Sequence, residues 1–361
     1  MRNALTLGFR NLTRFLRERV GWHRLGFFAS LVVLCLAGLT LYRMLRNIEP
    51  GRVVTAIAEM PASHIAIAAA LVACAYFTLT FYDFFALRTI GARHVPYRVA
   101  AMSAFTSYSI GHNLGATVFT GGAIRYRIYS GWNLTLVDVA KIAFVTGLTF
   151  WLGNAFMLGI GLVWVPEAAT AIDHLPPWIN RLIGLAGLTV ICLYLLWLTG
   201  GPRRIGIKGV VLTLPSARLT FVQILIGIAD LSLAALAMYM LLPAFPPADL
   251  MPFIVVFVLA TLLGFISHTP GALGVFDAAI LVALSQFARE DLLATLLVYR
   301  FLYYIVPFGF ALCLIAGREV WMAARREKPL SVQVPEIPDA GLPMAALKPS
   351  PPPCSGHRPN N

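Results

Sequence analysis

The sequence predicts an all-α, polytopic integral membrane protein, and three observations support that prediction. Hydrophobic residues make up 59% of the 361 residues and charged residues only 12%, against the ~25% of charged residues in a typical soluble domain. The mean hydropathy is +0.78. Apolar runs close to the ~20 residues of a transmembrane helix recur along the chain. Charged residues at 12% of the chain are too few to cover the surface of a soluble fold of this length, so a soluble enzyme is excluded.

The apolar runs predict about 7–8 transmembrane helices. In chain order the runs are Gly26–Tyr42, Ile65–Tyr82, Ile142–Pro166, Leu182–Pro202, Leu219–Leu242, Leu250–Ser267, Gly271–Phe287 and Leu292–Gly317. The first run follows an Arg-rich segment, residues 1–25, and has no clear cleavage site after it, so we expect an uncleaved anchor. The Arg-rich segment itself is expected to lie on the cytoplasmic membrane surface.

A further apolar stretch, Ala100–Ile124, is crowded with Gly, Ser, Thr and Asn and predicts a broken, re-entrant helix. Within it, Ile110–Ala116 aligns with Ile266–Ala272 at a constant offset, sharing Ile, His, Gly and Ala. We therefore expect broken segments around 100–124 and 264–287, related by an inverted repeat, inside one transmembrane domain, 26–317. Such paired interruptions are typical of a transporter's central binding site.

The formal net charge of +12 does not indicate nucleic acid here, because the basic residues gather on one side of the predicted spans. That side holds the Arg-rich start of the chain and the segment 318–361, a Pro-rich tail that is expected to be disordered. The positive-inside rule then predicts a bacterial inner-membrane protein with both termini cytoplasmic.

Two arginines in Thr120–Gly131 are candidates for a headgroup site. Two glycines, Gly121 and Gly122, are expected to free the backbone there, so that Arg125 and Arg127, on both sides of Tyr126, grip an anion. The alternative is an interfacial basic loop that touches headgroups without moving them. Elsewhere, Asp138 and Lys141 are expected to neutralise each other, and Asp83 either snorkels or has a function.

Arg300 is far from any predicted interface and needs an acidic partner, for which Asp230 and Asp277 are the candidates. We expect Arg300 and Tyr303 to contribute to the headgroup site. The two histidines of the repeat, His112 and His268, are expected to gate the path or carry protons, together with the two aspartates; helix packing is the alternative role. The expected hinges are Gly111, Gly115, Gly121, Gly122, Pro270, Gly271 and Gly274. Neither a metal nor a cofactor is expected, since no such motif is present.

Three segments resemble one family. Thr120–Gly131, Ile266–Asp277 and Val298–Pro307 are similar to the transmembrane, flippase region of the lysylphosphatidylglycerol synthases, or multiple peptide resistance factor family, and to its stand-alone YbhN-like members. The resemblance implies a protein that moves, or helps move, phospholipid between leaflets. It places Arg125, Arg127, Asp277 and Arg300 in the matching motifs. It also implies that lipid lysylation needs a cytoplasmic transferase domain, which this sequence lacks after its last predicted helix.

The leading hypothesis is therefore translocation of phospholipid, anionic or aminoacylated phosphatidylglycerol, through a polar groove where the two broken segments meet. Two alternatives stay open: a non-catalytic partner of a separate lipid synthase, and a membrane-embedded enzyme acting on lipid phosphates. Membrane phospholipid is the expected partner, and a homo-oligomer is left open.

Overall fold

The computed structural model describes residues 50–115, 117–200, 203–207, 210–243, 249–267 and 269–326. Of the described residues, those from 50 to 318 belong to one compact unit and those from 319 to 326 to a second. The predicted first span and the Arg-rich segment before it lie outside the described residues, as does the tail after Arg326. Helix dominates the described ranges, so the prediction of an all-α polytopic protein is confirmed.

Within the described ranges, five helices are long and apolar enough to cross a membrane. They are α4 (Ala62–Thr89), α7 (Leu136–Trp164), α9 (Pro177–Thr199), α10 (Ala217–Tyr239) and the continuous run Arg289–Val320. That run contains α13 (Arg289–Arg300), the π-helical segment η3 (Phe301–Ile305) and most of α14 (Val306–Arg326). A further apolar helix, α11 (Leu250–Ile266), has 17 residues. Each predicted span in the described ranges therefore has its helix, except Gly271–Phe287.

Local sequence signals set where these helices begin. Thr135 caps α7 in a capping box with Asp138, Pro177 occupies the first turn of α9, and the Ser216 side chain accepts a hydrogen bond from the first turn of α10. Between α9 and α10, two short strands pair antiparallel: β1 (Arg204–Ile207) and β2 (Val210–Thr213).

The first predicted break is present. Helix α5 (Tyr97–Leu114) ends at Gly115, whose φ of 73° is unfavourable for other residues, and α6 (Thr117–Tyr129) turns back and packs against it. We call α5 and α6 the first helical hairpin. Its many Ser and Thr residues are tolerated because α5 buries Ser103, Thr106 and Ser107 inside the protein.

The second break follows α11 and forms the second helical hairpin, α11 with α12 (Val275–Ala283). Between them lies the short helix η2 (Pro270–Ala272), and Gly271, Ala272 and Gly274 all have positive φ. With 9 residues, α12 is roughly 14 Å long, too short for the ~30 Å hydrocarbon core. The stretch Gly271–Phe287 therefore does not cross the membrane as a helix of its own, because the chain turns back here, in the segment around 264–287 where a break was expected.

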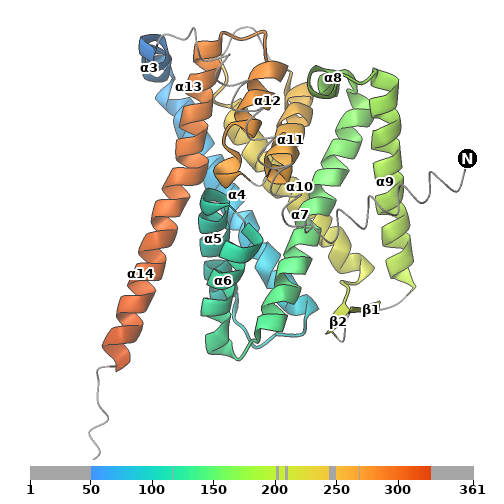
Figure 1. Ribbon diagram of the computed structural model, residues 1–361, viewed down its shortest axis with the longest axis vertical. Helices are drawn as coiled ribbons and strands as arrows, with labels where there is room; N and C mark the ends of the chain where they lie inside the picture. Colours follow the sequence, from blue (N-terminus) through green and yellow to red (C-terminus); the bar gives the residue numbers. More distant parts are fainter. Residues whose placement is uncertain are drawn as a thin grey trace, which may run out of the picture. The chain divides into compact units, whose positions relative to one another are not determined.

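The two hairpins enter the bundle from opposite ends (Figure 1). The first hairpin ends at η1 (Ser130–Trp132), beside the start of α7, whereas α11 and α12 contact α8 (Glu167–Asp173), beyond the end of α7. Helix α3 (Pro50–Glu59) contacts α13. This arrangement agrees with the opposite directions expected for the two copies of the repeat.

The long helices α4, α7 and α10 form the frame around the hairpins. Helices α7 and α10 cross at Gly153 and Gly227, where a Cβ added to Gly153 would lie 2.6 Å from the Cα of Gly227. Only glycine allows two backbones to come this close, as is common where membrane helices cross. The frame is therefore packed backbone to backbone at this point.

Candidate functional site

A cavity of about 250 Å³ lies where the ends of the two helical hairpins meet. Helix α5 contacts η2, so the two breaks in the chain are neighbours in space. At roughly 30 Å³ per water molecule, the cavity has room for about eight waters or a small headgroup. Helices α4, α7 and α10 and the segment η3 complete its walls.

About half of the residues that line the cavity are aromatic. The rings are those of Tyr82, Tyr108, Phe119, Phe150, Phe257, Phe265, Phe276, Tyr299, Tyr303 and Tyr304. Polar lining groups are few, and besides the tyrosine hydroxyls they are Asp230, His112, Thr261 and Thr269. The expectation of a polar groove is therefore corrected to an aromatic cavity with a small number of polar groups, which is the usual composition of a small-molecule site.

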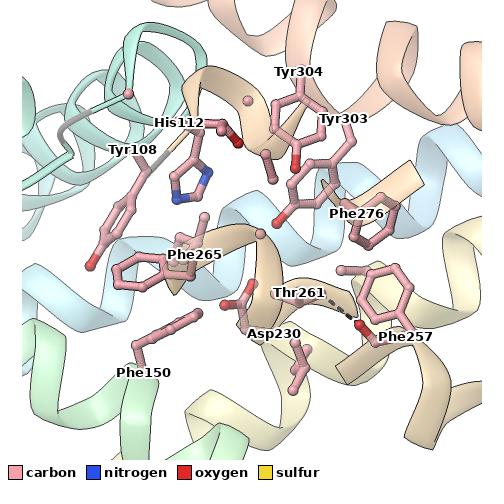
Figure 2. A pocket seen from close by; sticks show the side chains of 18 of the residues that line it. Tyr108, His112, Phe150, Asp230, Phe257, Thr261, Phe265, Phe276, Tyr303 and Tyr304 are labelled. Atoms are coloured by element: carbon pink, nitrogen blue, oxygen red, sulfur yellow. Dashed lines mark hydrogen bonds between the residues drawn. The ribbon is translucent and has the colours of Figure 1, made fainter. Parts of the chain in front are cut away.

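Asp230 is the charged group of this cavity. It lies on α10, its side chain is only 8% exposed, and its Oδ2 accepts a hydrogen bond from the Tyr82 hydroxyl at 3.1 Å. Its Oδ1 has no hydrogen-bond partner among the described residues. Figure 2 shows the carboxylate, the His112 ring and the Tyr303 side chain pointing toward the same space. A buried carboxylate oxygen beside the cavity is therefore left without a donor among the described residues.

His112 reaches the cavity from the last turn of α5, with its ring centroid 5.6 Å from that of Tyr108. This position agrees with a role in gating, which stays a prediction. The second histidine of the repeat, His268, lies outside the described residues, so its expected equivalence to His112 also stays a prediction.

Arg125 does not face the cavity as an open anion ligand. Its Nε and Nη2 donate to both carboxylate oxygens of Asp83 at 2.8–3.1 Å, and the Tyr129 hydroxyl donates to the same carboxylate at 2.8 Å. The arginine and aspartate side chains are 4% and 0% exposed. The expectation that Arg125 grips a headgroup is corrected, because its guanidinium fork already holds a carboxylate. Asp83 likewise does not snorkel to the surface.

Arg127 and Tyr126 are exposed on α6 and are absent from the cavity lining in the described structure. Residues two apart on a helix point about 200° apart, so Arg125 and Arg127 cannot hold one anion between them. Gly121 and Gly122 do not free the backbone, and the alternative of an interfacial loop is also wrong, because both glycines lie inside α6. Gly121 instead allows close packing, since a Cβ there would lie 3.3 Å from the Ser107 carbonyl oxygen.

Arg300 pairs with Asp277, one of its two expected partners, through two hydrogen bonds of 2.9 and 2.7 Å. Its Nη1 donates to the Gly271 carbonyl at 2.9 Å, and its guanidinium lies 5.5 Å from the Tyr304 ring centroid. Asp277 also accepts from the Gly274 amide at 2.9 Å. This arginine therefore ties the second break to α13, and its fork is occupied like that of Arg125.

Pro307 explains the π-helical segment beside the cavity. Because proline has no amide hydrogen, it leaves the carbonyl of Tyr303, four residues earlier, without its helical donor. The Tyr76 hydroxyl of α4 donates to this carbonyl at 2.9 Å, and the Asn113 amide of α5 donates to the Tyr304 carbonyl at 3.1 Å. Both neighbouring helices are thus attached to η3 through carbonyl oxygens, and π-helical turns of this kind are frequent at functional sites.

The expected hinges divide into two groups. Gly115, Gly271 and Gly274 have positive φ at the two breaks, and Pro270 begins η2. In contrast, Gly111 lies within α5, as Gly121 and Gly122 lie within α6, so those three positions do not form the break in the chain.

A buried polar stripe on α10 leads to the cavity. Thr220, Gln223, Gly227 and Asp230 recur at helical spacing on one face and are all buried. The Thr220 hydroxyl and both amide atoms of Gln223 have no hydrogen-bond partner in the part of the chain that the structure describes. Buried polar atoms of this kind are usually satisfied by ordered water.

Several site residues could not be found from the sequence. The aromatic lining residues do not stand out in the sequence, because aromatic residues make up 12% of the whole chain.

The expected Asp138–Lys141 pair is confirmed at 3.6 Å, close to the exposed start of α7. Among the described residues, no three His, Cys, Asp or Glu side chains gather closely enough to hold a metal ion.

Comparison with known proteins identifies relatives of two kinds. The chain is 33% identical over 263 residues to the uncharacterized protein slr0712 of Synechocystis sp., covering 72% of this chain and 80% of that protein. It is 28% identical over 251 residues to the inner membrane protein YbhN of Escherichia coli, covering 68% and 77%. Over 66 residues, 18% of this chain, it is 42% identical to the phosphatidylglycerol lysyltransferase of Staphylococcus epidermidis, of which that match covers 8%. No protein-family profile matches the chain.

Proposed function

The chain belongs to the family of YbhN-like inner membrane proteins, and on that premise we propose that it moves phospholipid between the two leaflets of the inner membrane. The apolar helices and the relationship to YbhN make it a multi-pass inner-membrane protein. The similarity of a short stretch to a phosphatidylglycerol lysyltransferase supports a lipid as the substrate.

One structural observation carries the proposal: two helix–break–helix hairpins enter from opposite ends and meet at an aromatic cavity. Transporters commonly place their substrate between such paired, interrupted segments. A headgroup would occupy the cavity while the acyl chains stay in the surrounding lipid. Movement of the hairpins against the frame of α4, α7 and α10 would open the cavity to one leaflet at a time.

The same proposal has two finer parts. Phosphatidylglycerol and its aminoacylated form are the first headgroups to test, because the partial relative is named for phosphatidylglycerol. Both termini are placed in the cytoplasm by the distribution of basic residues, so that the first hairpin enters from the cytoplasmic side. The chain is proposed to move lipid without lysylating it.

The proposal is tested by leaflet exchange in liposomes that contain the purified protein. Acyl-labelled fluorescent phosphatidylglycerol, lysyl-phosphatidylglycerol and phosphatidylcholine are followed by dithionite quenching of the outer leaflet. Ala234 lines the cavity and is 4% exposed, so Ala234→Phe fills the site. Val190 on α9 is 65% exposed, and Val190→Phe is the matched control of equal size on the lipid-facing surface.

We expect the wild-type protein and Val190→Phe to exchange at least one of these lipids well above empty liposomes, and Ala234→Phe to lose that exchange while its melting temperature stays near the wild-type value. Exchange by wild type at the rate of empty liposomes would contradict translocation. The remaining hypothesis would then be a partner of a separate lipid synthase, which co-purification of such an enzyme would support.

A further inference from the structure

Asp230 differs from the other buried carboxylates of the described structure. Asp83 and Asp277 each hold an arginine fork at hydrogen-bonding distance. Asp230 holds only the Tyr82 hydroxyl, and its Oδ1 has no partner among the described residues although the side chain is 8% exposed. An ionised carboxylate in such a place is costly unless a cation or several hydrogen bonds compensate it.

The cavity around Asp230 has an acidic group and no strongly basic one. Among the described residues that line it, Asp230 is the one carboxylic acid, and neither arginine nor lysine lines it. The two nearby arginines are neutralised by their carboxylates and do not line the cavity. A phosphate alone would therefore meet a carboxylate and no open guanidinium, whereas a cation would find its counter-ion in place.

The aromatic wall favours the same kind of ligand. Ring faces attract ammonium groups, and a cage of such rings with a carboxylate is a common way to recognise an amine. Tyr299 and Tyr303 stack with their centroids 5.3 Å apart, and Phe150 and Phe265 pack at 5.0 Å. All four rings line the cavity that Asp230 also lines, and Figure 2 shows Phe150, Phe265 and Tyr303 around it.

We propose that the cavity is an ammonium site, in which Asp230 and the surrounding aromatic rings bind the protonated primary amine of a phospholipid headgroup. The inference rests on the proposed function and narrows its substrate class. The amine has two sources in membrane lipids: an ethanolamine headgroup, or an aminoacyl ester on glycerol. The Tyr82 hydroxyl donates to Oδ2, and Oδ1, which is buried without a donor among the described residues, is the oxygen left to accept from the amine.

The test compares four acyl-labelled lipids in the liposome assay: phosphatidylethanolamine, N-acetyl-phosphatidylethanolamine, phosphatidylglycerol and lysyl-phosphatidylglycerol. The acetylated lipid has lost the amine charge and otherwise keeps the headgroup. We expect the wild-type protein to exchange at least one of the two amine lipids roughly tenfold faster than either lipid without a free amine. The faster of the two amine lipids identifies the source of the amine.

Asp230→Asn keeps the shape of the side chain and its contact with Tyr82, and is expected to remove the preference by slowing the amine lipid alone. Asp230→Glu, which keeps the charge, is expected to retain the preference. Asp138→Asn, at the exposed ion pair that starts α7, is the matched control and should behave as wild type. Because the wild-type comparison of free and acetylated amine needs no variant, the inference stays testable if Asp230→Asn does not fold.

Binding is measured separately, by native mass spectrometry of the detergent-solubilised protein with phosphatidylethanolamine, lysyl-phosphatidylglycerol and phosphatidylglycerol. Selective amine binding without exchange would overturn translocation and leave the ammonium site standing. Exchange without preference for a free amine would overturn the ammonium site and leave translocation standing. Equal slowing of all four lipids by Asp230→Asn would also overturn the ammonium site, because the carboxylate would then support the structure of the protein and not bind the amine.

Discussion

Breaking the buried ion pair between Arg125 and Asp83 is expected to destabilise the protein strongly, because the pair joins the first helical hairpin to α4. Three N···O contacts of 2.8–3.1 Å connect the two side chains, which are 4% and 0% exposed. Water therefore cannot solvate a charge that loses its partner. Two unit charges at ~4 Å attract by about 4 kcal/mol at an effective dielectric constant of ~20.

The perturbation is a double-mutant cycle of Arg125→Met, Asp83→Asn and the two together. Removing one partner of a buried pair typically costs ~3–5 kcal/mol, and we expect each single variant to lose that much unfolding free energy. The double variant leaves no unpaired charge, so it should lose less than the sum of the two. The expected coupling free energy is about 2–3 kcal/mol.

The free energy of unfolding is measured in mixed dodecylmaltoside–SDS micelles from tryptophan fluorescence and helical circular dichroism. The same cycle at Asp138 and Lys141, a pair at 3.6 Å whose side chains are 30% and 25% exposed, is the matched control and should give less than ~1 kcal/mol. Additive losses at Arg125 and Asp83 would refute the reasoning. So would an Arg125→Met variant of wild-type stability that no longer binds lipid, because that result would return Arg125 to the headgroup site.

Three further predictions concern packing and the two breaks, and each is measured as the change in unfolding free energy in the same micelles. Gly153→Ala places a Cβ 2.6 Å from the Cα of Gly227 and should cost ~1–3 kcal/mol through overpacking of α7 on α10. Tyr76→Phe leaves the Tyr303 carbonyl without its donor and should cost ~1–3 kcal/mol. Gly271→Ala forces a side chain onto a residue with φ of 61° and should cost ~1–2 kcal/mol.

Each of these variants has a control of the same chemistry. Gly147→Ala on α7 and Gly309→Ala on α14 add a Cβ where nothing lies within 4 Å, and should be neutral or stabilising because alanine favours helix. Tyr194→Phe removes a hydroxyl without a hydrogen-bond partner among the described residues and should change little. A control variant that loses as much unfolding free energy as its test variant would contradict the structural reason given for that test variant.

The two breaks were predictable from the sequence because their cause is local. Gly115 and Gly271 occupy equivalent places in the short repeat, and both adopt positive φ that other residues disfavour. The need of Arg300 for a carboxylate also followed from burial alone, which reduced its partner to two candidates. Of these, Asp277 was selected by the turn after η2, a feature of the folded backbone.

The partner of Arg125 could not be predicted, because Asp83 lies 42 residues earlier and only the packing of α4 on the first hairpin brings it near. The sequence Gly121–Gly122 was misleading for a related reason. Glycine pairs are typical of loops, but here Gly121 permits close approach to the Ser107 carbonyl within packed helices. The partner of Arg125 and the place of the two glycines both depend on contacts between distant segments, and such contacts also assemble the aromatic cavity.

Pro307 makes one oxygen beside the cavity depend on a neighbouring helix. With an ordinary residue at this position, the Tyr303 carbonyl could accept the usual hydrogen bond from the amide four residues later in its own helix. Proline removes that bond, and the Tyr76 hydroxyl of α4 supplies a donor in this structure. A state that separated α4 from η3 would take this donor away. Water, a headgroup or a shifted turn of the same helix would then have to replace it.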